Sequence, residues 1–363
     1  MEHNLPKLPA VRAIYGVDLG GVGKNAGRLI RIRGVATDSS PVRGSFASRR
    51  RIRLAVRLRC MRFDLSATAI CLLGCFAAQL AAQELQPRAY VPAPVGLNYF
   101  GISYSRNVGG LLFDASLPLE DVRATGNVTT FMFGQSFGIL GRSAQALVVL
   151  PYATASLEGL VSGAQRDLYR SGLGDAVFRY AMNLHGAPAM RMKEFLGYRQ
   201  KAIVGASITV SIPTGQYDPN RIINIGTNRW GFKPEVGVSY PLGRWVVEGA
   251  AGVWVYTANQ QFNGTSVRNQ VALGSLQTHV VRHLPLRSWV SVDLSFFTGG
   301  RTSVDRQDKP DYLGNGRWGI SYSISLRPRH AVKFNYFSGY VTRVGTDIRS
   351  LGISYNIVWR KGL

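Results

Sequence analysis

From Leu97 to Trp359 the chain repeats one pattern of hydrophobic and polar positions. Roughly ten to fourteen residues alternate between an apolar and a small or polar side chain, and a turn rich in Gly, Pro, Asn or Asp follows. Successive side chains of a β-strand point to opposite faces, so a period of two predicts strands with one apolar and one polar face. About twelve such segments can be counted, and they begin near residues 97, 126, 144, 174, 201, 229, 244, 270, 288, 316, 331 and 349.

The alternation is clearest in two stretches, AIVGASITVSI from Ala202 and WGISYSISL from Trp318, where Ser, Gly or Thr separates successive apolar residues over most of the length. A soluble β-sandwich or lipocalin-like barrel would turn its apolar faces inward. The dominance of Ser and Gly on the opposite face, with the number and length of the strands, favours a membrane protein instead. We therefore predict an all-β fold, an antiparallel up-and-down transmembrane β-barrel of about twelve strands over residues 97–359.

The segments are joined by connections that are alternately short and long. The short ones are PLGR at 241–244, HLPLR at 283–287 and RPRH at 327–330, and the long ones cover about 156–172, 213–228 and 299–315. Outer-membrane barrels have short periplasmic turns and longer external loops, so we expect both ends of the barrel chain to lie in the periplasm. The connection at 185–200 is long although it falls on the periplasmic side, and we expect it to carry a short helix.

Aromatic residues gather at the ends of the apolar faces, where interfacial girdles form in transmembrane barrels. Those expected in the girdles are Trp230, Tyr240, Trp245, Trp318, Tyr340 and Trp359. Near the C-terminus, Ser350, Gly352, Tyr355 and Ile357 fall at the spacing by which barrel-assembly machinery recognises its clients. A C-terminal tail, residues 360–363, follows Trp359, whereas many outer-membrane proteins end on an aromatic residue.

Residues 61–82 have the layout of a secretory signal peptide. Arg62 provides a basic start, residues 65–80 form an apolar stretch, and Ala81 and Ala82 are small residues near a cleavage point. The apolar stretch is short for a spanning helix, which takes about 20 residues. Cleavage near Ala82 would leave residues 83–96 as a periplasmic N-terminal segment.

The position of this signal bears on where the protein begins. A signal peptide is hard to use sixty residues inside a chain, so we expect translation to start at Met61, with residues 1–60 upstream of the true start. A genuine N-terminal extension is the alternative. Cys75 follows a Leu-Leu-Gly sequence that resembles a lipobox, which would instead make a lipidated Cys75 the first mature residue.

The net charge of +23 is unevenly placed. Residues 1–60 hold 13 Lys and Arg against 3 acidic residues, and from Gln83 onward 29 basic residues stand against 16 acidic ones. The densest basic run lacks stacking aromatics and RNA-binding motifs, so we expect no nucleic-acid partner. All three cysteines lie at or before Cys75, which excludes disulfides and thiolate metal sites from the rest of the chain.

Three strings resemble chemical motifs but lack essential parts. GGVGKN at 20–25 has Asp18 where a phosphate-binding loop needs Gly, and Asn25 where it needs Ser or Thr. The glycines at 314, 316 and 319 fit a dinucleotide motif, yet they lead from a loop into a strand and not a helix. The DRQDKPD loop at 305–311 offers three carboxylates to a Ca²⁺ ion, but its Arg and Lys favour a solvated charged loop. We therefore expect no cofactor and no metal.

A lipid hydrolase is the enzymatic alternative, and it needs a base near the outer leaflet. His185, His283 and His330 fall in expected periplasmic turns. His279 is expected low on its strand, facing inward. The histidines are thus badly placed for this chemistry, and we predict no enzyme and no catalytic residue.

Five stretches resemble one known family of outer-membrane proteins. They are YVPAPVGLNYF at 90–100, SGLGDAVFRYAMNL at 171–184, PTGQYD at 213–218, IGTNRWGFKPEVGVSY at 225–240 and NGRWGISYSISL from 315. They are similar to the family catalogued as the "Putative MetA-pathway of phenol degradation", whose members are often described as transporters. The resemblance implies an outer-membrane barrel that passes small aromatic or apolar compounds, and it assigns no chemistry to any side chain.

Polar residues on the inward faces of the predicted strands would line the lumen. The candidates are Asp175, Arg179, Lys233, Glu235, Glu248, Gln277, Arg282, Asp293, Arg327 and Lys333. Their charges mix both signs, so we expect weak ion selectivity at most. A twelve-stranded interior lies between a filled barrel of about eight strands and a porin of about sixteen, which predicts a narrow, partly blocked conduit.

The sequence therefore predicts an exported protein of the bacterial outer membrane that lets small molecules cross passively. Its expected partners are outer-membrane lipids, the barrel-assembly machinery and small-molecule solutes. The alternative is a non-conducting structural or adhesive barrel that acts through its external loops.

Overall fold

The computed structural model describes residues 86–112, 119–161, 164–221, 223–342 and 345–360. All of them belong to Met61–Leu363, the second of two compact units of the chain. The expected extension, the signal peptide, Cys75 and the last three residues of the tail lie outside these ranges. Within the ranges, no helix is long and apolar enough to cross a bilayer.

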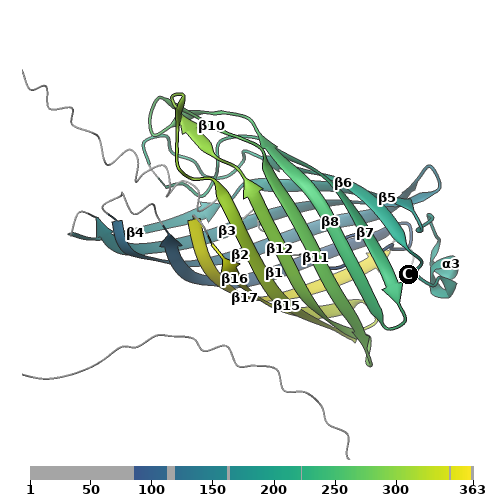
Figure 1. The fold of residues 1–363 in the computed structure, drawn as a ribbon. Coiled ribbons are helices and arrows are strands. Elements are labelled where there is room, and N and C mark those ends of the chain that lie inside the picture. Colours follow the sequence, from purple (N-terminus) through teal and green to yellow (C-terminus); the bar gives the residue numbers. More distant parts are fainter. Residues whose placement is uncertain (1–85, 113–118, 162–163, 222, 343–344, 361–363) are drawn as a thin grey trace, which may run out of the picture. The chain divides into compact units, whose positions relative to one another are not determined.

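Twelve antiparallel strands form a closed ring (Figure 1). Along the chain they are β1 (Leu97–Leu112), β2 (Leu119–Ile139), β3 (Arg142–Val161), β5 (Ala176–His185), β6 (Ile203–Ile212), β7 (Gly231–Leu242), β8 (Trp245–Tyr256), β11 (Leu273–Leu284), β12 (Ser288–Gly299), β15 (Leu313–Arg327), β16 (His330–Val341) and β17 (Gly345–Arg360). Each strand pairs with the next in this order, and β17 pairs back onto β1 along its whole length. Closure removes the sheet edges that lipid could not satisfy, and the predicted up-and-down barrel is confirmed.

Short turns join the strands at one end of the barrel, here the short-turn end, and longer connections join them at the other, the long-loop end. Between β2 and β3, Leu140 and Gly141 both have positive φ, 48° and 71°, as a two-residue hairpin turn requires. The connection between β5 and β6 also lies at the short-turn end and carries α3 (Met192–Gly197), as predicted (Figure 1).

An additional strand, β4 (Ala164–Leu173), pairs with the part of β3 that is nearest the long-loop end. At Pro151, which has no N–H group, β3 changes partner from β4 to β5, and the Pro151 carbonyl accepts a hydrogen bond from the Gly174 N–H at 2.8 Å. Strands β4 and β5 therefore follow β3 as one interrupted strand. The predicted loop at 156–172 was wrong, because most of it is a β-hairpin that extends the wall.

Two long connections pair with each other in a small second sheet, which the sequence pattern did not predict. It contains β9 (Asn259–Phe262) and β10 (Ser266–Gln270) from the connection after β8, and β13 (Thr302–Val304) and β14 (Gln307–Asp308) from the one after β12. The strand order is β14-β13-β10-β9. This sheet ties two loops together at the long-loop end of the barrel.

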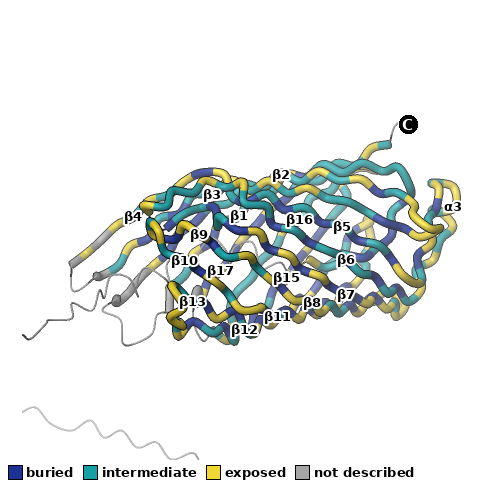
Figure 2. The backbone as a smooth tube through the Cα atoms, turned by 90° about the horizontal axis from the view of Figure 1, so that it is seen from above, coloured by how far each residue is buried: buried dark blue, intermediate teal, exposed yellow. Residues whose placement is uncertain are grey.

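The barrel is polar inside and apolar outside, the reverse of a soluble protein. In β7, Lys233 and Glu235 are buried, while Phe232, Val236 and Tyr240 are exposed. A similar alternation of buried and more exposed residues runs along other strands, among them β6, β11 and β12 (Figure 2). Polar side chains outnumber apolar ones among the buried residues that the structure describes. A soluble β-sandwich would bury its apolar face, so this pattern excludes it.

The aromatic residues expected in the girdles belong to the outer face. Five of them are exposed: Trp230, Tyr240, Trp245, Tyr340 and Trp359. The sixth, Trp318, is half-buried, and its ring meets Tyr336 edge-on at 5.7 Å between ring centroids. Their orientation is thus the predicted one.

Candidate functional site

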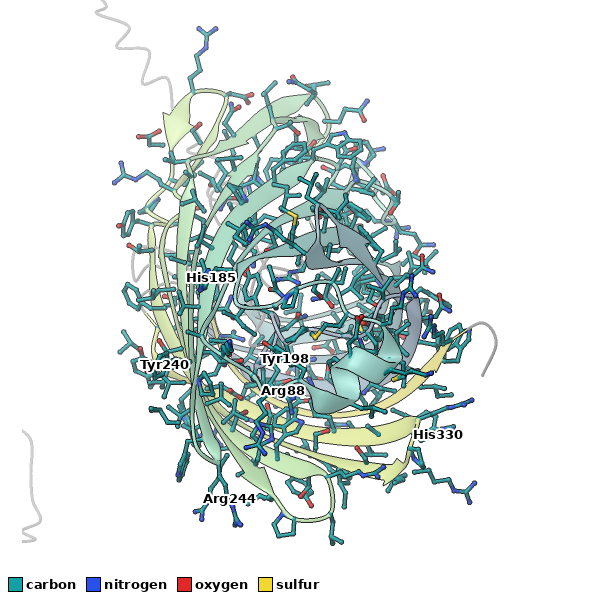
Figure 3. The ribbon with its side chains drawn as sticks, turned by 90° about the vertical axis from the view of Figure 1, so that its right-hand side faces the viewer. Arg88, His185, Tyr198, Tyr240, Arg244 and His330 are labelled. Carbon is teal, nitrogen blue, oxygen red and sulfur yellow. The ribbon has the colours of Figure 1, made fainter. Side chains whose placement is uncertain are left out.

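The segment that precedes β1 runs inside the barrel. We call residues 86–96 the inner segment. Tyr90 in this segment is only 5% exposed and packs against Ala181, Ala187 and Ile203. Seen from the short-turn end, Arg88 lies within the outline of the barrel (Figure 3). The sequence assigned these residues to the periplasm, and their contacts with the inner wall correct that assignment.

Two glycines make room for the Tyr90 ring. A Cβ atom on Gly237 would lie 2.7 Å from the ring Cδ2, and one on Gly205 would lie 2.8 Å from Cε1, with a further ring atom closer still in each case. Real Cβ contacts of this length are essentially never seen, so only glycine allows the ring to lie against β6 and β7. The ring therefore occupies a notch in the wall that the sequence has left open.

The Tyr90 hydroxyl reaches the charged centre of the lumen. It donates to Glu235 Oε1 at 2.9 Å and lies 3.1 Å from Ser207 Oγ. Burial raises the pKa of Tyr90 to about 12, and the charge of Glu235 adds to this effect. The hydroxyl therefore stays protonated and can donate at any physiological pH.

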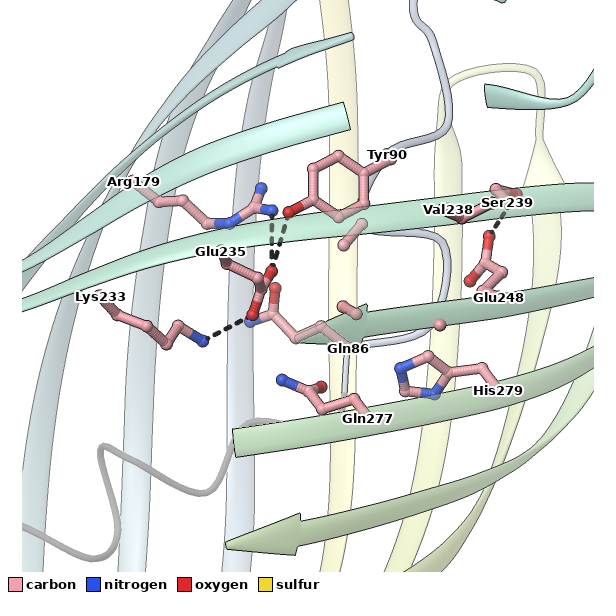
Figure 4. A pocket seen from close by; sticks show the side chains of 13 residues that line it. Gln86, Tyr90, Arg179, Lys233, Glu235, Val238, Ser239, Glu248, Gln277 and His279 are labelled. Carbon is pink, nitrogen blue, oxygen red and sulfur yellow. Dashed lines mark hydrogen bonds and ion pairs between the residues drawn. The ribbon is translucent and has the colours of Figure 1, made fainter. Parts of the chain in front are cut away.

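Glu235 connects Tyr90 to two cations. Lys233 Nζ lies 3.0 Å from Oε2, and Arg179 Nη2 lies 3.7 Å from Oε1, with all three side chains at most 7% exposed. The Arg179 guanidinium also lies 5.2 Å from the centre of the Tyr90 ring. We call Tyr90, Arg179, Lys233 and Glu235 the Tyr90 cluster (Figure 4). A buried carboxylate with several partners makes the position of the inner segment specific.

Other contacts hold the inner segment along its length. The Arg88 N–H donates to Glu248 Oε2, and Ser239 Oγ donates to Glu248 Oε1 at 3.0 Å. Burial lowers the pKa of Arg88, against the opposing charge of Glu248. Gln145 Nε2 donates to the Ala89 carbonyl at 2.9 Å. Near the start of β1, Ser136 Oγ donates to the Pro94 carbonyl.

A second buried network lies beside Glu248. In the register of β8, β11 and β12, Glu248 is opposite His279 and His279 is opposite Asp293. His279 Nδ1 is 2.8 Å from Asp293 Oδ1, and the Ser291 and Ser321 hydroxyls donate to Asp293 Oδ2 at 3.1 and 2.9 Å. Both hydroxyls thus bind the carboxylate and not the imidazole, whereas a catalytic triad needs the serine on the histidine.

Eight of the ten predicted lumen residues face inward. Seven of them are buried: Asp175, Arg179, Lys233, Glu235, Glu248, Gln277 and Asp293. The eighth, Lys333, is opposite Ser323 and Ser354, and both of these are buried. Residues directly opposite each other in an antiparallel pair share a face, so Lys333 points inward as well. The structure brings Arg179, Lys233 and Glu235 into one cluster.

The other two predictions were wrong. Arg282 is exposed, lies opposite Trp245, and places its guanidinium 4.9 Å from the centre of that outward ring. Gln277 and Arg282 are five residues apart on one regular strand, so they cannot share a face. Arg327 is exposed at the end of β15, where an irregularity between Ser325 and Arg327 interrupts the period of two.

Several inward residues were missed. Tyr90 carries no strand periodicity, because it precedes the first strand, and Arg229 and Arg268 lie outside the twelve ring strands. Arg317 could have been found, since it alternates with Trp318 in a strand that was predicted to begin near residue 316. Trp254 was missed because it is aromatic, and apolar residues were assigned to the outer face.

The three aspartates of the 305–311 loop have separate partners. Asp305 Oδ1 accepts a hydrogen bond from the Val267 N–H at 2.8 Å, and Asp308 lies 3.6 Å from an Arg301 nitrogen. Asp311 accepts from the N–H and the hydroxyl of Thr302. The three carboxylates of this loop therefore bind β10, β13 and Arg301, the residue before β13.

Residues 106–275, from the middle of β1 to the start of β11, match the profile of the family described as "Putative MetA-pathway of phenol degradation". The resemblance to this family is confirmed. An outer membrane channel from Pseudomonas putida F1 has a similar fold, with a TM-score of 0.65 and 19% identity over 76% of this chain and 100% of that one. The β domain of the Bordetella autotransporter Brka aligns at a TM-score of 0.45, with 14% identity over 73% of this chain and 100% of that one. No curated protein matches the chain.

Proposed function

We propose that the protein is an outer-membrane channel through which small aromatic or apolar molecules diffuse passively. The observation that carries the proposal is a closed ring of strands with an apolar outer face and a polar interior. The solved channel of similar fold and the phenol-degradation description of the family support the choice of a channel and of its solutes. Outer-membrane lipids and the barrel-assembly machinery are then its partners, and residues 61–82 direct its export.

In this proposal the short-turn end faces the periplasm, and the inner segment narrows the conduit there. The inner segment crosses the lumen at the level of Glu235 and Glu248. A pocket beside Tyr90 is lined also by Gln277 and His279 (Figure 4). A solute on its way to the periplasm passes through this pocket, and the eight inward residues named above line its route.

Conductance and uptake test the channel together. Planar bilayers that contain the purified protein should show discrete conductance steps. Intact cells with a lipopolysaccharide-bearing outer membrane should take up radiolabelled phenol faster when they produce the protein than when they do not. Heat-modifiable gel mobility verifies folding in both assays. A folded protein that passes no ions and does not speed uptake would refute the proposal.

The second candidate is a non-conducting structural or adhesive barrel. The β3–β4 hairpin and the second sheet favour this function, because they give the long-loop end an ordered surface. Deletion of the β13–β14 hairpin tests this function. Loss of a surface interaction in the deletion variant, in a barrel that never conducts, would support the adhesive function over the channel.

A further inference from the structure

An apolar patch interrupts the polar inner wall near the long-loop end. It consists of Trp254, Leu273, Phe297 and Leu313, each at most 8% exposed, and we call it the lumen patch. The four residues come from β8, β11, β12 and β15, which are neighbours in the ring. Most other buried positions in the described part of the barrel are polar. The lumen patch is therefore a place where an apolar group can be held inside the barrel.

Polar groups beside the lumen patch are buried without a hydrogen-bond partner. They are Trp254 Nε1, Arg317 Nη2 and Ser295 Oγ. Ser295 and Arg317 are opposite each other in the pairing of β12 with β15, and Ser295 is two residues from Phe297. Indole and guanidinium N–H groups can only donate, whereas the Ser295 hydroxyl can donate or accept, so two of the three groups need an acceptor. Burying a donor without an acceptor is costly, and a ligand that brings one would relieve that cost.

The two buried aspartates at this end, Asp175 and Asp311, are engaged with other groups. Asp175 accepts from the N–H groups of Gly215 and Thr227 and from the Thr227 hydroxyl. Asp311 accepts from the N–H and the hydroxyl of Thr302. Asp347 is exposed and makes no hydrogen bond to the Arg317 Nη2 group. None of these three carboxylates accepts a hydrogen bond from the donors beside the lumen patch, so these donors are available to an acceptor on a solute.

Two cations lie near these donors, and one of them, Lys233, is paired with Glu235. Lys233 Nζ lies 5.5 Å from the centre of the Trp254 ring, and the Arg229 guanidinium lies 4.3 Å from that of Tyr256. The two rings are stacked on each other, with 5.8 Å between their centres and 5° between their planes. Glu248, by contrast, is the fourth residue of β8 counted from the short-turn end. The long-loop half of the lumen thus combines cations with aromatic rings.

We propose that the lumen patch binds an apolar or aromatic molecule that carries a carboxylate. This rests on the proposed channel and names one class of its solutes. The hydrocarbon part would lie on the lumen patch, and the carboxylate oxygens would accept hydrogen bonds from Arg317, Ser295 and the Trp254 N–H. A guanidinium group suits this role, because its geometry matches a planar carboxylate.

Equilibrium dialysis with three probes of similar shape tests the site directly. The detergent-solubilised protein is dialysed against radiolabelled benzoate, benzyl alcohol or benzylammonium at pH 7, and empty micelles are subtracted. Benzoate should bind at least tenfold more tightly than the neutral and the cationic probe. This ratio corresponds to a difference of about 1.4 kcal/mol in binding free energy. Arg317→Gln should abolish this preference, whereas Arg306→Gln, which alters an exposed cation between β13 and β14, should preserve it.

A second variant covers the case in which Arg317→Gln does not fold. Trp254→Phe retains an aromatic ring and loses only the indole N–H, so it should weaken benzoate binding about threefold and leave benzyl alcohol binding unchanged. Equal affinity for the three probes, or an unchanged benzoate preference in these variants, would overturn the site. Conductance without a benzoate preference refutes this site alone, and a benzoate preference in a barrel that neither passes ions nor speeds phenol uptake refutes the channel alone.

Discussion

The notch that holds Tyr90 leads to a sharp prediction for Gly237→Ala. The new methyl group would lie 2.7 Å from the Tyr90 Cδ2 atom and closer still to a second ring atom. Carbon atoms pack at about 3.5–4.0 Å, so the ring has to withdraw by about 1 Å or leave the notch. A withdrawal of that size stretches the 2.9 Å bond to Glu235 beyond the range of a hydrogen bond.

The size of the effect follows from what the ring loses. A hydrogen bond to a charged group contributes about 1.5–3 kcal/mol. Burial of a large apolar side chain contributes about 1.5–3 kcal/mol more, of which a displaced ring loses only a part. A total of about 3 kcal/mol corresponds to roughly a hundredfold rise in the population whose inner segment is detached.

Hydrogen exchange of residues 86–96 and single-channel conductance measure this population. Gly237→Ala should accelerate exchange throughout the inner segment and raise the mean conductance. Gly249→Ala is the matched control, because a Cβ there meets only the Gln277 carbonyl oxygen at 3.8 Å. If Gly237→Ala exchanges and conducts like this control, Tyr90 does not hold the inner segment in place.

Three further predictions concern the lumen and its wall. Glu235→Gln leaves two buried cations without their carboxylate, so it should lower the free energy of unfolding by about 3–5 kcal/mol, measured by urea titration of tryptophan fluorescence; an unchanged midpoint would contradict the role of Glu235. The pKa of Tyr90 is raised by attachment of the inner segment, so attachment should be fully stable below about pH 10, the usual value, and should be lost as pH rises toward about 12. Ultraviolet absorbance is titrated with pH in the wild type and in Tyr90→Phe, and the difference between the two curves reports the ionisation of Tyr90. A midpoint of this difference near pH 10 would disprove the shift. Arg282→Gln should leave conductance unchanged, because the side chain lies on the outer face over Trp245, and a clear change in single-channel current would return Arg282 to the lumen.

The regular part of the barrel could be predicted because alternation fixes both a strand and its faces. Lys233 and Glu235 were placed inside because Phe232, Val236 and Val238 require the opposite face, and the structure agrees. The same rule fails where the period breaks. Arg327 follows an irregularity in β15, which no composition signal marks.

The inner segment could not be predicted for a different reason. Tyr90 bonds to Ser207 and Glu235, which are 117 and 145 residues away along the chain. No local pattern encodes contacts of that range. The glycines at 205 and 237 looked like ordinary small residues on the polar face of a strand, and their purpose becomes visible only when the Tyr90 ring lies against them.

The seam between β1 and β17 has a consequence for how the protein is made. Leu97 pairs with Arg360 and Leu112 with Gly345, so the first ring strand, which pairs with β2 along one edge, has no partner for its other edge until the last strand is made. Bringing such distant segments together carries a large loop-closure entropy and makes folding slow. During that delay β1 exposes unpaired N–H and C=O groups, which invite pairing with another chain. A nascent barrel of this design is therefore most vulnerable to aggregation in the interval before its two ends meet, and shielding that edge is the service it most needs from a chaperone.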